Sequence, residues 1–170
     1  MTEPMPRQAA VLCGGRGTRL RPYTDTTPKP MVEVVNRPFL EHLLRQLAEQ
    51  GIVRFVLMTG HLGEQIHEYF GTGSRWGWDI GYSHGPADWD TGRRVVEAAG
   101  LLDDSFVLLY SDNFALVDLG VLADRHAATG RSLTLTLKLK TGGNVRYSPQ
   151  RDVTAYDPIR SAPGLDHVEI

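Results

Sequence analysis

The sequence predicts an α/β fold with a mainly parallel sheet, because short apolar runs alternate along the chain with segments of helical periodicity. The first run, Ala9–Cys13, ends at two glycines, and one amphipathic segment separates it from the next strong run, Val53–Thr59. Parallel strands need such a crossover between them. With 170 residues, 41% of them hydrophobic, the chain can bury one core, so we expect a single domain over residues 1–170.

The elements of the first two thirds follow from local patterns. Small and apolar residues make Ala9–Cys13 a buried strand. Apolar residues at helical spacing predict a helix from Pro38 to Gln50, with Gly51 where a C-terminal cap belongs. Val53–Thr59 is almost wholly apolar, as buried strands are. The further expected elements are a helix at Glu64–Phe70, a strand at Asp79–Ser83, a helix at Thr91–Ala99 that buries Val95, Val96 and Ala99, and a strongly buried strand at Phe106–Tyr110.

The last third begins with a helix and continues in strands. Asp118 is an expected N-cap for a helix that runs to Gly130. Leucines alternate with polar residues over Ser132–Lys140, which predicts a strand with one wet face. Further strands are expected at Val153–Tyr156 and from His167 to the chain end. Because the sequence stops as that last strand begins, we expect the domain to be incomplete at its C-terminus.

Composition limits the partners. The chain has 18 lysines and arginines against 20 aspartates and glutamates, a formal net charge of −2, so no global basic field favours nucleic acid or an anionic membrane. The longest apolar runs fall far short of the ~20 residues that span a bilayer. A polar N-terminus and the single Cys13, which excludes an intramolecular disulfide, predict a cytoplasmic setting.

Three glycines, Gly14, Gly15 and Gly17, follow the first strand. Such a loop exposes backbone N–H groups that can cradle phosphate. The loop lacks the Gly-Lys-Ser/Thr end of the Walker motif, and Leu20 stands where the dinucleotide fingerprint needs a third glycine. Glycine spacing alone therefore leaves open a second interpretation, a tight turn with solvated arginines.

The longer string from Leu12 to Thr24, followed by Pro28-Lys29-Pro30, resembles the signature of the sugar-1-phosphate nucleotidylyltransferases. The resemblance continues through residues 36–40, 69–77 and 107–112, and residues 69–77 are most similar to the heptose and mannose 1-phosphate guanylyltransferases. It implies a three-layer α/β/α Rossmann-like nucleotidyltransferase domain with a mainly parallel mixed sheet. It also implies an enzyme that joins a nucleoside triphosphate (NTP) and a sugar 1-phosphate into an NDP-sugar and releases pyrophosphate.

The resemblance assigns roles to particular residues. It implies that Arg19 holds the departing pyrophosphate and that Lys29 binds oxygens around the reacting phosphorus, so that Arg19, Lys29 and Asp112 are the catalytic residues. Nucleotide binding is expected at Leu12, Gly14, Gly15, Gly17, Thr18, Arg19, Thr91 and Gly92. Arg160 and Glu169 are the expected contacts of the sugar phosphate and the sugar hydroxyls. Self-association into a homo-oligomer is a further expectation from the family.

Two of these residues also stand out without the resemblance. Lys29 is one of only three lysines, and its flanking prolines hold it on a stiff backbone. Asp112 follows an expected strand at its carboxyl end, where α/β sheets place ligands, and its oxygens suit Mg²⁺. Ser111 stands where the family usually has glycine, and the family's second metal carboxylate is expected beyond Ile170. Cys13 is expected to pack beside the loop, although a phosphate-binding turn can lower a thiol pKa.

Nucleotide choice stays open in the sequence. Thr91 and Gly92 match the family's base-recognition loop, but Asp90, Arg93 and Arg94 depart from it. The two arginines are either readers of a guanine edge or exposed residues of a first helical turn. The preferred substrates are GTP with D-glycero-D-manno-heptose 1-phosphate or mannose 1-phosphate. The alternatives are a dTTP- or UTP-dependent glucose 1-phosphate nucleotidylyltransferase and a nucleotide-binding module without turnover.

Overall fold

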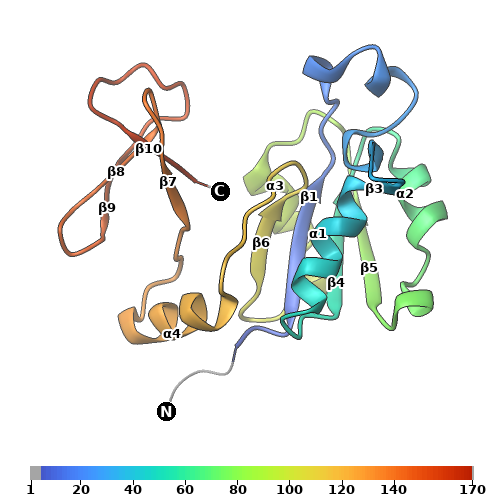
Figure 1. The fold of residues 1–170 in the computed structure, drawn as a ribbon, viewed down its shortest axis with the longest axis horizontal. Coiled ribbons are helices and arrows are strands. Elements are labelled where there is room, and N and C mark those ends of the chain that lie inside the picture. Colours follow the sequence, from blue (N-terminus) through green and yellow to red (C-terminus); the bar gives the residue numbers. More distant parts are fainter. Residues whose placement is uncertain (1–4, 170) are drawn as a thin grey trace. The chain divides into compact units, whose positions relative to one another are not determined.

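The computed structural model describes residues 5–169, which divide after Phe114 into two compact units. The first unit holds a four-stranded sheet in the order β5-β4-β1-β6 (Figure 1). Its strands are β1 (Gln8–Cys13), β4 (Arg54–Thr59), β5 (Asp79–His84) and β6 (Val107–Tyr110). All three pairings are parallel, so the carboxyl ends of the four strands lie along one edge.

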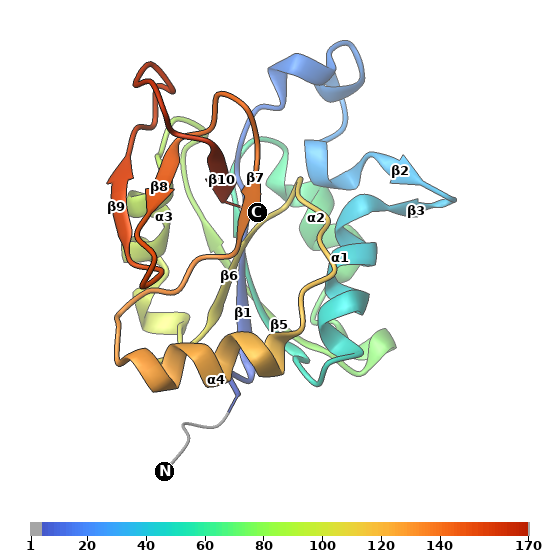
Figure 2. The ribbon, with the colours of Figure 1, turned by 60° about the vertical axis from the view of Figure 1, so that its left-hand side comes forward.

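Helices cover both faces of this sheet. The helices α1 (Phe39–Ala48) and α2 (Gly63–Phe70) lie on one face, and α3 (Thr91–Glu97) lies on the other (Figures 1 and 2). Alternate residues of each strand pack on opposite faces of the sheet, because successive side chains of a strand point in opposite directions. The cluster on the α3 side consists of Ala10, Leu12, Val56, Met58 and Ala98. The expected three-layer α/β/α fold is confirmed.

A buried carboxylate links α1 to the loop that follows α2. Glu41 is 3% exposed and accepts hydrogen bonds from the Tyr69 hydroxyl at 2.6 Å, from Arg45 at 2.8 Å and from the Trp76 ring nitrogen at 3.4 Å. Burial alone raises the pKa of Glu41, but these hydrogen bonds and the Arg45 charge outweigh burial and hold that pKa below its ordinary value. The ionised carboxylate therefore fixes α1 against α2.

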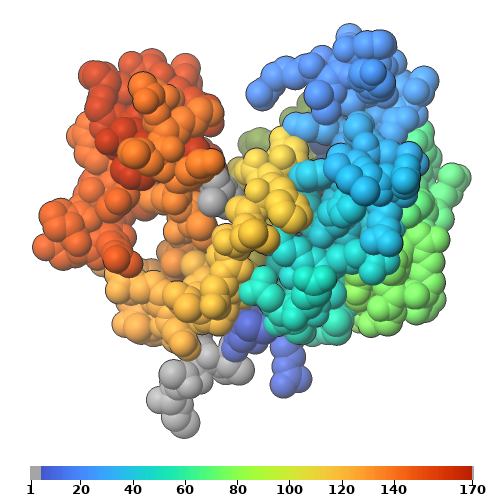
Figure 3. Space-filling view, in the orientation of Figure 1, coloured from blue at the N-terminus to red at the C-terminus, as the bar shows by residue number. Residues whose placement is uncertain are grey.

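Short elements surround the sheet. A hairpin of β2 (Glu33–Val34) and β3 (Arg37–Pro38) turns at Val35 and Asn36, both with positive φ, as two-residue hairpin loops require. On the face that Figure 3 shows, the last residues of the first unit, after β6, lie beside α1, and the rings of Phe39 and Phe114 meet edge to face with centroids 6.4 Å apart. Single 3-10 turns lie at Thr18–Leu20, Tyr23–Asp25, Lys29–Met31, Ser74–Trp76 and Ala99–Leu101.

The second unit contains one helix and a second sheet. The helix α4 (Leu119–Thr129) begins at Asp118, whose carboxylate accepts from the Val121 N–H at 3.0 Å, as the sequence predicts for an N-cap. The sheet is antiparallel, in the order β7-β10-β8-β9. Its strands are β7 (Leu137–Leu139), β8 (Val145–Tyr147), β9 (Val153–Tyr156) and β10 (His167–Glu169).

The structure corrects three sequence expectations. The strand expected over Ser132–Lys140 is limited to β7, and Leu133 and Leu139 are 65% and 70% exposed. The strand expected to be strongly buried at 106–110 is β6 at a sheet edge, where Tyr110 is 38% exposed, because only β1 pairs with it. The buried positions are Arg94 in α3 and Ala98 directly after it, rather than Val96 and Ala99.

No helix within residues 5–169 combines the length and the apolar character that crossing a membrane requires.

Candidate functional site

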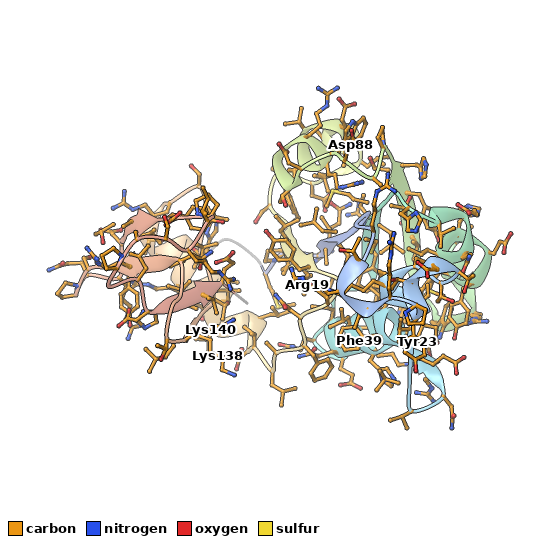
Figure 4. The ribbon with its side chains drawn as sticks, turned by 90° about the horizontal axis from the view of Figure 1, so that it is seen from above. Arg19, Tyr23, Phe39, Asp88, Lys138 and Lys140 are labelled. Carbon is orange, nitrogen blue, oxygen red and sulfur yellow. The ribbon has the colours of Figure 1, made fainter. Side chains whose placement is uncertain are left out.

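A cavity of about 420 Å³ lies at the carboxyl edge of the parallel sheet, within the first unit. Figure 4 shows this edge from above, with Arg19 on the loop after β1 and Asp88 on the loop before α3. Four segments line the cavity: the end of β1 with its loop, the turn at Lys29, the start of α3, and the end of β6. The lining residues are Leu12, Cys13, Gly14, Gly15, Gly17, Thr18, Arg19, Lys29, Pro30, Trp89, Asp90, Thr91, Arg94, Tyr110, Ser111 and Asp112.

The structure brings most of the sequence-predicted residues into this cavity. Every expected nucleotide-binding residue except Gly92 lines it, as do the three expected catalytic residues. Arg160 and Glu169 belong to the second unit, and their expected contacts with the sugar phosphate stay predictions. Glu169 accepts a hydrogen bond from the Asn144 side chain at 3.3 Å. Trp89, Asp90, Pro30 and Tyr110 also line the cavity, although the sequence analysis assigned them no binding role.

The glycine loop is folded around Gly17, which has a left-handed φ of 61°. A Cβ atom at this position would lie 2.9 Å from both Lys29 Cβ and Thr24 Cγ2, so a larger residue meets both conformational strain and a steric clash. The Thr24 hydroxyl donates to the Gly17 carbonyl at 2.9 Å and fixes the turn. Gly17 therefore lets the chain pass close to Lys29.

Lys29 and Asp112 form an ion pair inside the cavity. Lys29 begins a 3-10 turn behind Pro28, and Asp112 follows β6, so two separate segments place the opposite charges together. Their side chains are 32% and 41% exposed, which leaves both accessible from the cavity. An ammonium and a carboxylate in this arrangement can neutralise phosphate oxygens and bind a hard cation, respectively.

A magnesium ion fits Asp112 only with help from a ligand. Within residues 5–169, histidine, cysteine and carboxylate side chains form no group of three or more that can hold a metal ion. Mg²⁺ is usually bound by one or two carboxylates together with substrate phosphates and water. Asp112 can supply the one carboxylate that such a site needs, and the phosphate chain of a nucleotide bound at the glycine loop would supply further oxygens.

Ser111 replaces the family's glycine without opening the site. Its side chain is buried, and its hydroxyl donates to the Leu12 carbonyl at 2.7 Å. The Ser111 N–H also donates to the same carbonyl, at 3.3 Å. These two bonds tie the end of β6 to β1, beneath Asp112. Ser111 therefore holds the start of the segment that carries Asp112 against β1.

Arg94 is a residue of the cavity wall for which the sequence left two interpretations open. It is 5% exposed, and its guanidinium donates to three backbone carbonyls: to Thr59 at 2.9 Å, to Pro86 at 2.7 Å and to Gly14 at 3.3 Å. Of the two interpretations, the exposed residue of a first helical turn is therefore wrong for Arg94. Burial lowers its pKa below the ordinary value, although an arginine remains charged at neutral pH.

Arg93 behaves as the exposed interpretation predicts. Its side chain is 59% exposed and pairs with Glu97 at 2.6 Å, and its guanidinium lies 5.3 Å from the centre of the Trp89 ring. The Arg93 N–H donates to the Asp90 carboxylate at 2.7 Å, which makes Asp90 the N-cap of α3. Asp90 thus departs from the family pattern for a structural reason.

Cys13 lies at the end of β1 and is buried. Burial raises the pKa of its thiol to about 12, and a hydrogen bond with Ser111 and the Arg94 charge offset only part of that rise. The packing role expected for Cys13 agrees with this environment. The suggestion of a lowered thiol pKa is wrong, because desolvation outweighs the nearby positive charge.

A smaller, apolar hollow of about 200 Å³ shares the Lys29–Asp112 pair with the main cavity. Its other walls come from the 3-10 turn after the glycine loop, the hairpin with the residue before it, α1 and the end of β6: Leu20, Val32, Val34, Phe39 and Ser111. The ion pair therefore lies between the main cavity and an apolar hollow.

Comparison with known proteins finds one matching family and many relatives. A family profile described as nucleotidyl transferase matches residues 8–146. The chain is 35% identical over 143 residues to a UTP–glucose-1-phosphate uridylyltransferase of Synechocystis sp., a match that covers 77% of this chain and 37% of that protein. It is 36% identical over 132 residues to a D-glycero-alpha-D-manno-heptose 1-phosphate guanylyltransferase of Aneurinibacillus thermoaerophilus, covering 77% and 57%.

A mannose-1-phosphate guanylyltransferase of Mycobacterium tuberculosis is 38% identical over 130 residues, covering 76% of this chain and 36% of that protein. The chain thus spans between about a third and three fifths of the length of these relatives. Among solved structures, a UDP-glucose pyrophosphorylase complexed with UDP-glucose matches with a TM-score of 0.76 and 16% identity, covering 98% of this chain and 74% of that one. At that identity the structural match supports the fold alone.

Proposed function

Because this chain belongs to the nucleotidyl transferase family, we propose that its protein transfers a nucleoside monophosphate from an NTP to a sugar 1-phosphate. The products are an NDP-sugar and pyrophosphate. The observation that carries the proposal is the convergence of the glycine loop, Arg19, Lys29 and Asp112 on one cavity at the carboxyl edge of a parallel sheet. Such an edge is where α/β folds bind nucleotides.

The proposed reaction needs charge neutralisation and alignment more than proton transfer. The phosphate of the sugar 1-phosphate is already an anion at neutral pH and attacks the α-phosphorus, while the bond from that phosphorus to the pyrophosphate oxygen breaks. Such transfers are catalysed mainly by positioning and by stabilisation of negative charge. Backbone N–H groups of the glycine loop bind the phosphates, Arg19 binds the departing pyrophosphate, and Lys29 binds oxygens at the reacting phosphorus.

Mg²⁺ is part of the proposal, and Asp112 is the residue that would hold it. A bound divalent ion supplies further neutralisation of the phosphate oxygens. In the free protein the Asp112 carboxylate pairs with Lys29. Binding of a nucleotide with its metal would therefore exchange this internal pair for two contacts with the ligand.

We propose GTP as the nucleotide, with D-glycero-D-manno-heptose 1-phosphate or mannose 1-phosphate as the acceptor. Relatives named as guanylyltransferases for these two sugars, at 36% and 38% identity, support this choice. The uridylyltransferase relative, at 35% identity, supports UTP with glucose 1-phosphate as the second candidate. Arg160 and Glu169 are the proposed sugar-side residues.

We further propose that both compact units form one nucleotidyltransferase domain, since the family profile crosses the boundary between them at Phe114. The free thiol of Cys13 supports a reducing, cytoplasmic setting. Self-association is proposed from the family resemblance alone.

A substrate matrix tests the proposal. Pyrophosphate release is measured with Mg²⁺ for GTP, UTP, dTTP and CTP against mannose, heptose and glucose 1-phosphates, and the NDP-sugar is identified by mass spectrometry. Release confined to GTP with mannose or heptose 1-phosphate supports the preferred assignment. Faster release with UTP or dTTP and glucose 1-phosphate would overturn that choice of substrates. Nucleotide binding without release from any pair would instead favour a binding module without turnover.

A further inference from the structure

The Arg94 guanidinium connects the loops at the ends of three neighbouring strands. Its three acceptors are the carbonyls of Gly14, which follows β1, of Thr59, which ends β4, and of Pro86, which follows β5. The side chain lies directly against the glycine loop, since a Cβ atom on Gly14 would fall 2.1 Å from the Arg94 Cζ. Gly14 therefore provides the space that the guanidinium occupies.

These contacts determine how the glycine loop presents its N–H groups. In a trans peptide the C=O and the following N–H point in opposite directions. Holding the Gly14 carbonyl toward Arg94 therefore also fixes the direction of the Gly15 N–H. The His61 N–H also donates to the Gly14 carbonyl, at 3.3 Å, and Gly15 itself lines the cavity. A Cβ atom on Gly15 would meet nothing within 4 Å, so this residue faces open space.

The charge on Arg94 has no direct counterion in the described part of the chain. Among residues 5–169, no carboxylate forms an ion pair with it, and Asp88 attracts it only at longer range. Three carbonyl dipoles stabilise the guanidinium, but a buried charge is normally paired as well. Because Arg94 lines the cavity, an anion bound there would be attracted by its charge.

We propose that Arg94 is a positioning residue of the nucleotide site, which holds the glycine loop in its phosphate-binding conformation and whose positive charge is balanced by the bound triphosphate. This inference rests on the proposed function, because it takes the ligand of the cavity to be an NTP. The proposal assigns Arg94 to the phosphate chain rather than to the base, because three of its five N–H groups donate to backbone carbonyls and one of these carbonyls belongs to the glycine loop.

Two measurements on Arg94→Gln test this role, with Arg94→Lys as the charge-preserving variant in case the first does not fold. Arg54→Gln is the matched control. It removes the two hydrogen bonds that Arg54 donates to Asp103, but these lie at the amino end of β4, away from the cavity. The first measurement is the NMR order parameter of the Gly14 and Gly15 amides in the free protein. The second is the dissociation constant for GTP, UTP and inorganic tripolyphosphate, each with Mg²⁺.

If Arg94 clamps the glycine loop in this way, the Gly14 and Gly15 amides have order parameters of about 0.85 in the unaltered chain and below about 0.6 in Arg94→Gln. The clamp also predicts that affinity falls about tenfold or more, by the same factor for all three ligands, with a smaller loss in Arg94→Lys and none in Arg54→Gln. Unchanged loop order in both Arg94 variants would overturn the clamp. A loss of affinity for GTP alone would overturn the assignment of Arg94 to the phosphate chain and would favour a role in recognition of the base.

Failure of the proposed function has a different signature. If the unaltered chain binds none of the three ligands, the proposed function and the balancing of charge by triphosphate are both overturned. The order parameters of the free protein still decide whether Arg94 holds the loop.

Discussion

Replacing Gly14 by alanine should destabilise the first unit far more than the same change at Gly15. The added Cβ of Gly14→Ala would lie 2.1 Å from Arg94 Cζ, whereas ordinary contact begins at 3.4 Å, so the guanidinium must move by about 1.3 Å. An arginine tip normally yields easily, but this one is buried and makes hydrogen bonds of 2.7, 2.9 and 3.3 Å. A displacement of 1.3 Å is enough to break bonds of such length.

The magnitude follows from the number of bonds at risk. Loss of two or three hydrogen bonds at about 1 kcal/mol each lowers the free energy of unfolding by about 2–3 kcal/mol. For a chain of this size, that corresponds to a fall in melting temperature of about 4–12 °C. Gly15→Ala should leave stability unchanged or raise it by up to about 1 kcal/mol, because its Cβ meets nothing and alanine restricts the unfolded chain.

Urea unfolding at neutral pH, followed by tryptophan fluorescence, measures both variants against the unaltered chain. Equal stability of Gly14→Ala and Gly15→Ala would refute the reasoning, because it would mean that the guanidinium moves aside without losing its partners. Combining Gly14→Ala with Arg94→Gln gives a second check. If the clash is the cause, the double variant loses less stability than the sum of the two single changes.

Three further predictions concern titratable groups. Because the folded pKa of Glu41 lies below its ordinary value of 4.5, its ionised form stabilises the fold above that pH, and the contribution is lost as the pH falls through the folded pKa. Glu41→Gln should cost about 1–3 kcal/mol at pH 7 and flatten this acid dependence in urea titrations. An unchanged acid dependence would contradict the argument that hydrogen bonds and the Arg45 charge lower the pKa of Glu41. Cys13, with a thiol pKa of about 12, should react with a disulfide reagent at pH 8 only after unfolding, and rapid reaction in the native protein would count against its burial. Asp157 should titrate near pH 2 by NMR, because N–H groups of Ala162 and Ile159 bond its carboxylate, and Asp157 with an ordinary value would show that this turn is open in solution.

Local patterns predicted most of the fold. The helix α1 lies within the expected 38–50 range, because apolar spacing and the cap at Gly51 are properties of adjacent residues. The bounds of β9 (Val153–Tyr156) match the prediction, and β4 begins one residue after the expected start. The strand expected at 132–140 was overpredicted, because alternation specifies a strand only where one face is buried, and Leu133 and Leu139 are exposed. The strand β8 was missed within a segment rich in Gly, Asn and Pro.

The parts of the candidate site that belong to a sequence motif could be predicted, and the part that depends on tertiary contacts could not. The glycine loop, Lys29 and Asp112 are recognisable from a string of residues, and the sheet brings them to one cavity. The burial of Arg94 depends on carbonyls at 80, 35 and 8 residues' separation, which no local pattern encodes. The glycines at 14 and 60 were the available signal, because a Cβ at either would crowd the guanidinium.

The proposed transfer depends most directly on Lys29, the side chain proposed to bind oxygens at the reacting phosphorus. The measurement is the turnover number for pyrophosphate release with saturating GTP, mannose 1-phosphate and Mg²⁺, compared between the unaltered chain, Lys29→Ala and Lys29→Arg, with melting temperatures recorded for all three. Assignment of Lys29 to the transition state predicts a fall of about 100-fold or more in Lys29→Ala, without a matching loss of stability. An unchanged turnover number in Lys29→Ala would contradict that assignment and would mean that the reaction does not take place at Lys29 in this cavity.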